Sequence, residues 1–186
     1  SPTKMRQTVE PILEISDLQT HFFTKAGTLR AVDGVSFEIG AGEIVGLVGE
    51  SGSGKSITGF SIIGLVDSPG KIIGGSIKFK GKDLNDLSNE QMQQVRGNRI
   101  AMIFQDPMMT LNPVLRVETQ MIEAIQAHDN KISREDARIR SRDALGLVGI
   151  SSPDERLRAY PHQFSGGMRQ RVSIAIAMLN RPDLII

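Results

Sequence analysis

Residues 49–56 read Gly49-Glu50-Ser51-Gly52-Ser53-Gly54-Lys55-Ser56, and they fit the phosphate-loop pattern G-x-x-x-x-G-K-[ST] without a mismatch. Glycines in such a loop let the backbone turn tightly and bring its N–H groups close to an anion. Lys55 can reach the β- and γ-phosphates of a nucleotide, and the Ser56 hydroxyl can ligate Mg²⁺. The pattern therefore predicts a site for a nucleoside triphosphate and Mg²⁺.

The residues on either side of this loop favour the same interpretation. Residues 43–48 form an apolar run that is typical of a buried parallel strand. Residues 55–66 predict a helix, because Ile57, Phe60 and Ile63 fall on one face. A strand, a glycine loop and a helix N-terminus together make an anion site. A glycine-rich turn without a ligand is the alternative, and these flanks make it the weaker hypothesis.

Composition sets broad limits on the function. The chain has 186 residues, of which 39% are hydrophobic and 23% charged, which suits one globular domain or most of one. The formal net charge of +1 gives no overall basic field for nucleic acid. The absence of cysteine excludes disulfides and thiolate metal sites, and His21, His128 and His162 show no paired ligand spacing. No apolar run approaches the roughly 18 residues that span a bilayer, so any membrane role must come through a partner.

Hydrophobic periodicity and capping signals predict the remaining elements. Strands are expected at about 12–18, 35–39, 74–80, 100–104 and 184–186, with a loop after the first of them that runs through Gly27. Helices are expected after a capping box at 88–91, at 117–128, at 133–149 and at 169–180. The order is α/β, with a helix-rich insert between about residues 117 and 163.

Two further features follow the phosphate loop. Gln105 comes directly after the predicted strand 100–104, and Ser165-Gly166-Gly167 precedes the predicted helix 169–180. Each is weak alone, since a Ser-Gly-Gly before a helix is usually a cap. In this order, however, they resemble the ATP-binding cassette (ABC) ATPases. Residues 49–56 match the Walker A motif of that family, Gln105 its Q-loop, and residues 164–168 (Phe-Ser-Gly-Gly-Met) its signature, which is usually Leu-Ser-Gly-Gly-Gln.

The resemblance implies a role for each site residue. Gln105 would be catalytic, because it would touch Mg²⁺ and the attacking water, and Ser56 would be the other metal ligand. Phe22 lies where the family places its adenine-stacking aromatic, although the adjacent Phe23, or core packing, is an alternative. The residues that would bind ATP are Phe22, Gly49, Glu50, Ser51, Gly52, Ser53, Gly54, Lys55, Ser56, Ser165, Gly166 and Gly167. The last three would bind the γ-phosphate of an ATP held by a second cassette domain.

Other segments look like the oligopeptide and dipeptide importer ATPases: 31–37, 106–113 and 160–163. This resemblance implies an ATP-binding subunit that couples ATP hydrolysis to the uptake of peptides or similar small solutes. Its partners would be a second ABC ATPase domain, transmembrane permease subunits and, indirectly, a solute-binding protein. It would lie on the cytoplasmic face of the inner membrane as a peripheral protein. His162 belongs to the 160–163 segment, so we expect a structural role for it rather than that of the catalytic switch histidine.

The family resemblance also implies a fold. It is an α/β P-loop NTPase of ABC type, with a mainly parallel core sheet, an antiparallel β subdomain and a helical subdomain. Residues 1–186 would form a single incomplete nucleotide-binding domain with the helical insert at about 117–163. Residues 184–186 match the strand that leads into the Walker B acidic pair, and that pair does not occur in the sequence. We therefore expect the 186-residue chain to be inactive alone, since hydrolysis needs a group that orients the attacking water.

Three other functions compete with this hypothesis. A soluble GTPase is disfavoured because no Asn-Lys-x-Asp motif occurs, although 67–70 and 143–146 fit Asp-x-x-Gly. A non-transport ABC ATPase of the DNA-repair type would carry a long coiled-coil insertion between Q-loop and signature, and this interval is short. A catalytically incompetent nucleotide-binding fragment stays open.

Overall fold

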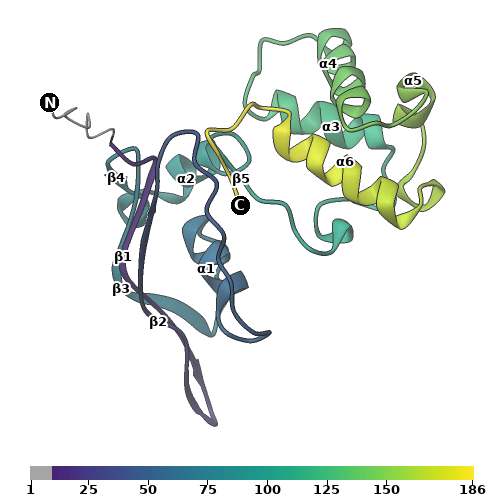
Figure 1. Ribbon diagram of the computed structural model, residues 1–186. Coiled ribbons are helices and arrows are strands. Elements are labelled where there is room, and N and C mark those ends of the chain that lie inside the picture. Colours follow the sequence, from purple (N-terminus) through teal and green to yellow (C-terminus); the bar gives the residue numbers. More distant parts are fainter. Residues whose placement is uncertain (1–9) are drawn as a thin grey trace, which may run out of the picture. The chain divides into compact units, whose positions relative to one another are not determined.

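The computed structural model describes residues 10–186, which divide into two compact units (Figure 1). The N-terminal unit extends to Met92, and the C-terminal unit comprises Gln93–Ile186. The N-terminal unit carries the phosphate loop, and the C-terminal unit carries Gln105 and Ser165.

An antiparallel sheet of order β2-β1-β3-β4 forms most of the N-terminal unit. Its strands are β1 (Leu13–Thr24), β2 (Gly27–Ile39), β3 (Gly70–Phe79) and β4 (Lys82–Asp83). Leu13 of β1 pairs with Ile39 on one side and Phe79 on the other, so β1 is the central strand of this group. Leu13, Ile15, Leu18 and Ile77 are buried within the sheet. Leu13 and Ile15 alternate with polar residues, whereas Leu18 follows a register shift between β1 and β2.

The predicted loop between residue 18 and Gly27 is wrong. β1 continues to Thr24 and turns directly into β2 at Gly27 (Figure 1). In a hairpin, the hydrogen bonds between the two strands stabilise both of them, and they continue here through the pair Thr24 and Gly27. Thr24 reinforces the turn, because its Oγ1 donates to the Gly27 carbonyl at 2.8 Å.

Helix α1 (Lys55–Ile62) begins where the phosphate loop predicts and ends four residues before position 66. Gly64 adopts a positive φ of 69°. Its N–H donates to the Ser61 carbonyl, and the Leu65 N–H donates to the Phe60 carbonyl at 2.9 Å. This pair of bonds is a Schellman motif, which closes a helix with glycine in the left-handed conformation. Two short helices complete the unit, η1 (Leu84–Asp86) and α2 (Asn89–Val95), the latter crossing the boundary at Met92.

The expected strand at residues 43–48 is absent, which is the largest difference from the sequence analysis. The segment is irregular, and the side chains of Ile44 and Val48 are 98% and 90% exposed. A strand exists only where a neighbouring strand satisfies its N–H and C=O groups. Among residues 10–186, no strand pairs with this segment. The predicted burial of this run is therefore wrong as well, because an apolar run contains no information about a partner strand.

The C-terminal unit is mainly helical. Its elements are β5 (Ile100–Ala101), η2 (Pro107–Met109), α3 (Val117–Gln126), α4 (Arg134–Leu147), α5 (Pro153–Leu157), η3 (Pro161–Gln163), α6 (Gly166–Met178) and β6 (Leu184–Ile185). Helices α3, α4 and α6 match the predicted ones to within three residues at each end, whereas α5, η2 and η3 were not predicted. β5 and β6 form a parallel pair, with Ile100 opposite Leu184. Both predicted strands therefore exist, but the part of the chain that the structure describes contains only this one parallel pair.

Apolar side chains from the helices and the connecting loops form the core of this unit. The fully buried face of α3 comprises Val117, Met121, Ile122 and Ile125, which recur at helical spacing. They pack with residues of the other helices, including Leu145, Leu157 and Val172.

His128, just after α3, is expected to make the unfolding of the protein pH-dependent. Its Nδ1 is buried and has no hydrogen-bond partner among the described residues. Burial, together with the nearby positive charge of Arg99, lowers the pKa of His128 from its usual 6.5. The unfolded chain therefore binds a proton more readily than the folded one, and stability is expected to fall as the pH drops below about 6.5.

The expected result is a decrease in the free energy of unfolding between pH 7 and pH 5, measured by urea titration. A His128→Gln variant should flatten that pH profile, because it removes the titrating group. His162→Gln is the matched control, since His162 is exposed. Equal flattening in both variants would contradict this assignment.

Candidate nucleotide-binding site

The phosphate loop runs from Gly49 into the first turn of α1 and owes its shape to two glycines. Gly52 and Gly54 have positive φ angles of 81° and 93°. A Cβ at Gly54 would overlap the carbonyl oxygen of Ala31 in β2, whereas a Cβ at Gly52 would meet nothing within 4 Å. Gly54 is therefore required both by its backbone conformation and by close packing, and Gly52 only by its conformation.

The start of α1 is suited to an anion. No side chain caps this helix, and its first turn contains no acidic residue. Its first N–H groups and the positive end of the helix dipole therefore have no negative partner in the N-cap residue or the first turn. The Lys55 ammonium donates to the Gly49 carbonyl and so stays folded over the loop. Ser56 lies exposed beside it.

Two phenylalanines lie near the end of β1. Phe22 is half-buried, and its ring lies close to β3, because a Cβ at Gly70 would be 2.7 Å from the Phe22 Cε1. Phe23 is 50% exposed and contacts the His21 ring at a centroid distance of 6.4 Å. The exposure of Phe23 argues against a role for it in the core.

Gln105 lies exposed between two anchored segments of the C-terminal unit. Before it, the Ile103 N–H donates to the Ile186 carbonyl at 2.8 Å and extends the pairing of β5 with β6. After it, Leu111 is buried in the helical core. Gln120 of α3 also fixes this second segment, because its side chain accepts from the Asn112 N–H at 2.8 Å and donates to the Asn112 carbonyl at 2.7 Å.

Ser165, Gly166 and Gly167 form the exposed N-terminus of α6. The Ser165 Oγ accepts from the Met168 N–H at 3.2 Å, so the residue is an N-cap, as a bare Ser-Gly-Gly predicts. A Cβ at either glycine would meet nothing within 4 Å outside its own helix and chain neighbours. Packing within the unit therefore does not require glycine at these two positions, and they leave room for a ligand to approach the helix.

The chain just before Ser165 is held rigidly. The His162 ring is stacked on Tyr160 at a centroid distance of 5.8 Å, and the Arg169 Nε donates to the Pro161 carbonyl at 2.9 Å. Phe164, at the signature position usually occupied by leucine, is buried in the helical core. Phenylalanine at this position therefore anchors the segment in the core, as an apolar leucine would.

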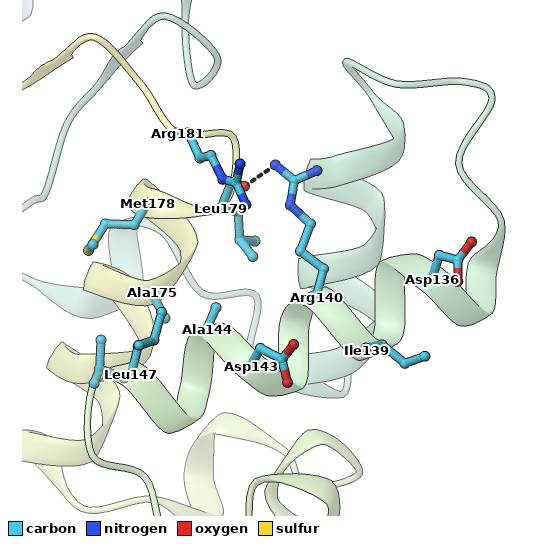
Figure 2. Close-up of a pocket in the computed structure, with 11 residues that line it drawn as sticks. Asp136, Ile139, Arg140, Asp143, Ala144, Leu147, Ala175, Met178, Leu179 and Arg181 are labelled. Carbon is cyan, nitrogen blue, oxygen red and sulfur yellow. Dashed lines mark hydrogen bonds between the residues drawn. The ribbon is translucent and has the colours of Figure 1, made fainter.

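A groove of about 440 Å³ lies between α4 and α6 (Figure 2). Its walls are partly apolar, with Leu147 and Met178, and partly charged, with Arg140 and Asp143. None of the residues that the sequence analysis assigns to nucleotide binding lines this groove.

Each of the two units carries one part of the predicted site. Residues 49–56 form one loop at the start of α1, and Gln105 and Ser165–Gly167 are exposed segments of the other unit. Sequence analysis missed the polar residues that hold these segments, namely Gln120, Arg99 and Asn180. Their bonds run to backbone atoms up to 83 residues away, and no local pattern marks them.

The described residues contain neither a metal-binding cluster nor a membrane-spanning helix. Residues 10–186 contain no cluster of three or more acidic or histidine side chains that could hold a metal ion. In the same range, no helix has both the length and the apolar character needed to cross a membrane.

Known relatives of the chain are transport ATP-binding proteins. The chain is 50% identical over 176 residues to the oligopeptide transport ATP-binding protein AppD of Bacillus subtilis (strain 168), covering 94% of this chain and 53% of AppD. It is 46% identical over 177 residues to the dipeptide transport ATP-binding protein DppD of Escherichia coli (strain K12), covering 94% and 53%. The chain thus spans about half the length of the curated relatives it matches.

Solved structures show the same fold. A post-hydrolysis dimer of the ATP-binding cassette MJ0796, bound to ADP and Pi, matches with a TM-score of 0.82 at 27% identity, covering 93% of this chain and 72% of that one. The protein cbiO1 from Clostridium perfringens, part of the ABC transporter complex cbiONQ, matches with a TM-score of 0.71 at 26% identity, covering 95% and 64%. The family model described as ABC transporter matches residues 32–186, which is most of the chain. The chain therefore belongs to the ABC transporter family of ATPases, with the α/β cassette fold that the motifs predicted.

Proposed function

We propose that this chain is the ATP-binding part of an ABC importer subunit that couples ATP binding and hydrolysis to the uptake of peptides or similar small solutes. The observation that carries the proposal is the phosphate loop, whose Gly54 conformation and uncapped helix start suit a nucleotide phosphate. The relatives named for oligopeptide and dipeptide transport support the cargo class. Because the family match at 32–186 crosses the boundary between the two units, we assign both units to one nucleotide-binding domain with a helical insert at about 117–163.

In this proposal, the backbone N–H groups of residues 49–54 and the Lys55 ammonium bind the phosphates. Ser56 and Gln105 hold Mg²⁺. Their hydroxyl and amide oxygens are hard ligands, and Mg²⁺ usually binds through few protein ligands together with substrate phosphates. Gln105 also orients the attacking water.

Ser165, Gly166 and Gly167 bind the γ-phosphate of an ATP held by a second cassette. The open space above both glycines supports this role, since nothing in the unit fills it. The dimeric MJ0796 cassettes support the pairing of two such domains. The further partners are permease subunits and, through them, a solute-binding protein, which would place the subunit peripherally at the cytoplasmic face of the inner membrane.

One rival hypothesis loses support from the helical unit. A DNA-repair type of cassette would carry a long coiled coil between Gln105 and Ser165. The longest helix in that interval is α4, with 14 residues, and it packs into the core of the unit.

The test is ATP-driven transport by the full-length subunit assembled with its permease partners in vesicles. Labelled dipeptides and oligopeptides should accumulate with ATP and not with a slowly hydrolysed analogue. A Lys55→Ala subunit should abolish the accumulation. Uptake that does not depend on ATP, or a lack of uptake of every peptide tested, would refute the proposal.

Phe22 is expected to stack on the adenine. Phe22→Ala should weaken ATP binding by about 1–3 kcal/mol, by analogy with the stacking of bases on aromatic side chains. Phe23→Ala is the matched control, and because that ring is half exposed, its loss should cost little stability or affinity. Calorimetry with ATP and with inorganic tripolyphosphate separates the effects, since only ATP has a base. If Phe23→Ala were the variant that weakens ATP binding, Phe22 would be the wrong phenylalanine.

A further inference from the structure

Helix α6 links two parts of the proposed site within the C-terminal unit. Ser165 is its N-cap, and its 13 residues run from Gly166 to Met178, a length of about 20 Å. Beyond its far end, the chain passes through Pro182 into β6 and pairs with β5, the strand that precedes Gln105. Whether Ser165 and Gln105 move together therefore depends on the connection between α6 and β6.

Two arginines hold the carbonyl groups at the end of α6. Arg140 of α4 donates to the Leu179 carbonyl, as Figure 2 shows. The Arg99 Nη2 donates to the Asn180 carbonyl at 2.7 Å and to the Arg181 carbonyl at 3.3 Å. Cationic donors are favourable here, because the C-terminus of a helix carries partial negative charge and unpaired carbonyls.

Arg99 fixes the segment to β5 as well as to the helix. Its Nη1 donates to an Asp183 carboxylate oxygen at 3.3 Å, and its backbone carbonyl accepts from the Asp183 N–H at 2.8 Å. The Asn180 side chain adds bonds to the carbonyls of Gly97 and Ala124, both at 3.2 Å. We call Arg99, Asn180 and Asp183 the α6 clasp.

The linker that the clasp encloses is stiff. Arg181 adopts a φ of 48°, which is unfavourable for a residue with a side chain, and the bond from Arg99 to its carbonyl helps to hold it there. Pro182 has a fixed φ. A linker of this kind cannot absorb a displacement of α6, so the displacement must pass to β5. Gln105 follows only two residues after the last bond of this sheet, at Ile103.

We propose that the α6 clasp couples Ser165 to Gln105, so that binding of a phosphate at the signature end of α6 sets the position of Gln105 at the other nucleotide. Arg99 is then a positioning residue for hydrolysis. This inference rests on the proposed function, because it needs ATP at both ends. The clasp does more than cap α6, since Arg99, next to β5, also bonds Asp183, and Asn180 also donates to the Gly97 carbonyl.

The test is a double-mutant cycle on the ATPase rate of the full-length subunit assembled with its partners. Ser165→Ala should lower kcat about 100-fold, as expected for the loss of a donor to transition-state charge. Arg99→Ala should lower kcat about 10-fold through misplacement of Gln105, with the Kd for ATP unchanged. The double variant should lose no more than about threefold beyond Ser165→Ala, because the clasp then has no signal to transmit. Residues this far apart are additive when they are uncoupled.

Controls separate coupling from folding. Arg142→Ala removes an exposed arginine whose guanidinium bonds only the adjacent Asp143 in the described structure, and it should leave kcat unchanged. Arg99→Lys keeps the charge but not the fork of donors, so it should restore kcat only in part. If Arg99→Ala does not fold, Arg99→Lys takes its place in the double-mutant cycle.

Losses of kcat that multiply in the double variant, or an Arg99→Ala rate equal to wild type, would overturn the coupling. Failure of the proposed function is distinguishable, since in that case Lys55→Ala would bind ATP as well as wild type does.

Discussion

The Lys55→Ala variant is expected to bind ATP about 1.5–3 kcal/mol more weakly, which is roughly 10- to 150-fold in Kd, because it loses a hydrogen bond to a charged group. Lys55 is the only cation in the loop 49–56. Its ammonium already lies over the loop, bonded to the Gly49 carbonyl, so little side-chain ordering is needed when phosphates arrive. Calorimetry with Mg²⁺ and a slowly hydrolysed ATP analogue measures the change.

Lys82→Ala is the control for that experiment. Lys82 is an exposed lysine of β4 in the same unit, so this variant changes the net charge equally without touching the loop. Its affinity should equal that of wild type. Equal losses in both variants would show only a general effect of charge, and an unchanged Lys55→Ala would remove the phosphate loop from nucleotide binding. Tighter binding of GTP than of ATP would favour the GTPase hypothesis.

The sequence predicted best what depends on neighbouring residues. The glycines of 49–56 and the start of α1 at Lys55 are local features, and so is the cap that Ser165 makes on α6. The buried face of α3 followed from helical spacing alone, since Val117 and Met121 recur along one side.

The sequence failed where structure depends on distant partners. Residues 43–48 have the composition of a buried strand and remain exposed, because a strand needs a partner that the segment itself does not specify. For the opposite reason, the end of the β1–β2 hairpin at residues 19–27 was mistaken for a loop, since its partner strand is present and stabilises it. The bonds from Arg99 to Asn180 and Asp183 join residues more than 80 positions apart, and no pattern of neighbours marks an arginine as such an anchor.

Gly54→Ala is expected to disrupt the phosphate loop, and Gly52→Ala supplies the comparison that isolates the cause. Both positions have positive φ angles, so alanine costs about 1–2 kcal/mol of backbone strain at either one. Only at Gly54 does the added methyl group also overlap a backbone atom, the Ala31 carbonyl oxygen of β2. Such overpacking typically adds about 1–3 kcal/mol. Ala31 lies in β2 at a register shift against β1, and its carbonyl oxygen moves only with the backbone, not as a flexible side chain would.

The loop or the strand must therefore move in Gly54→Ala, and the first turn of α1 moves with the loop. Displaced N–H groups lose their bonds to the phosphates, so ATP affinity should fall at least about tenfold, the cost of one hydrogen bond to a charged group. Urea unfolding measures the stability of each variant and calorimetry its affinity, both relative to wild type. Gly52→Ala should show the strain cost in stability without the further loss from overlap. Equal effects of the two substitutions would mean that contact with Ala31 does not shape the loop, and that conformational strain alone explains the need for glycine there.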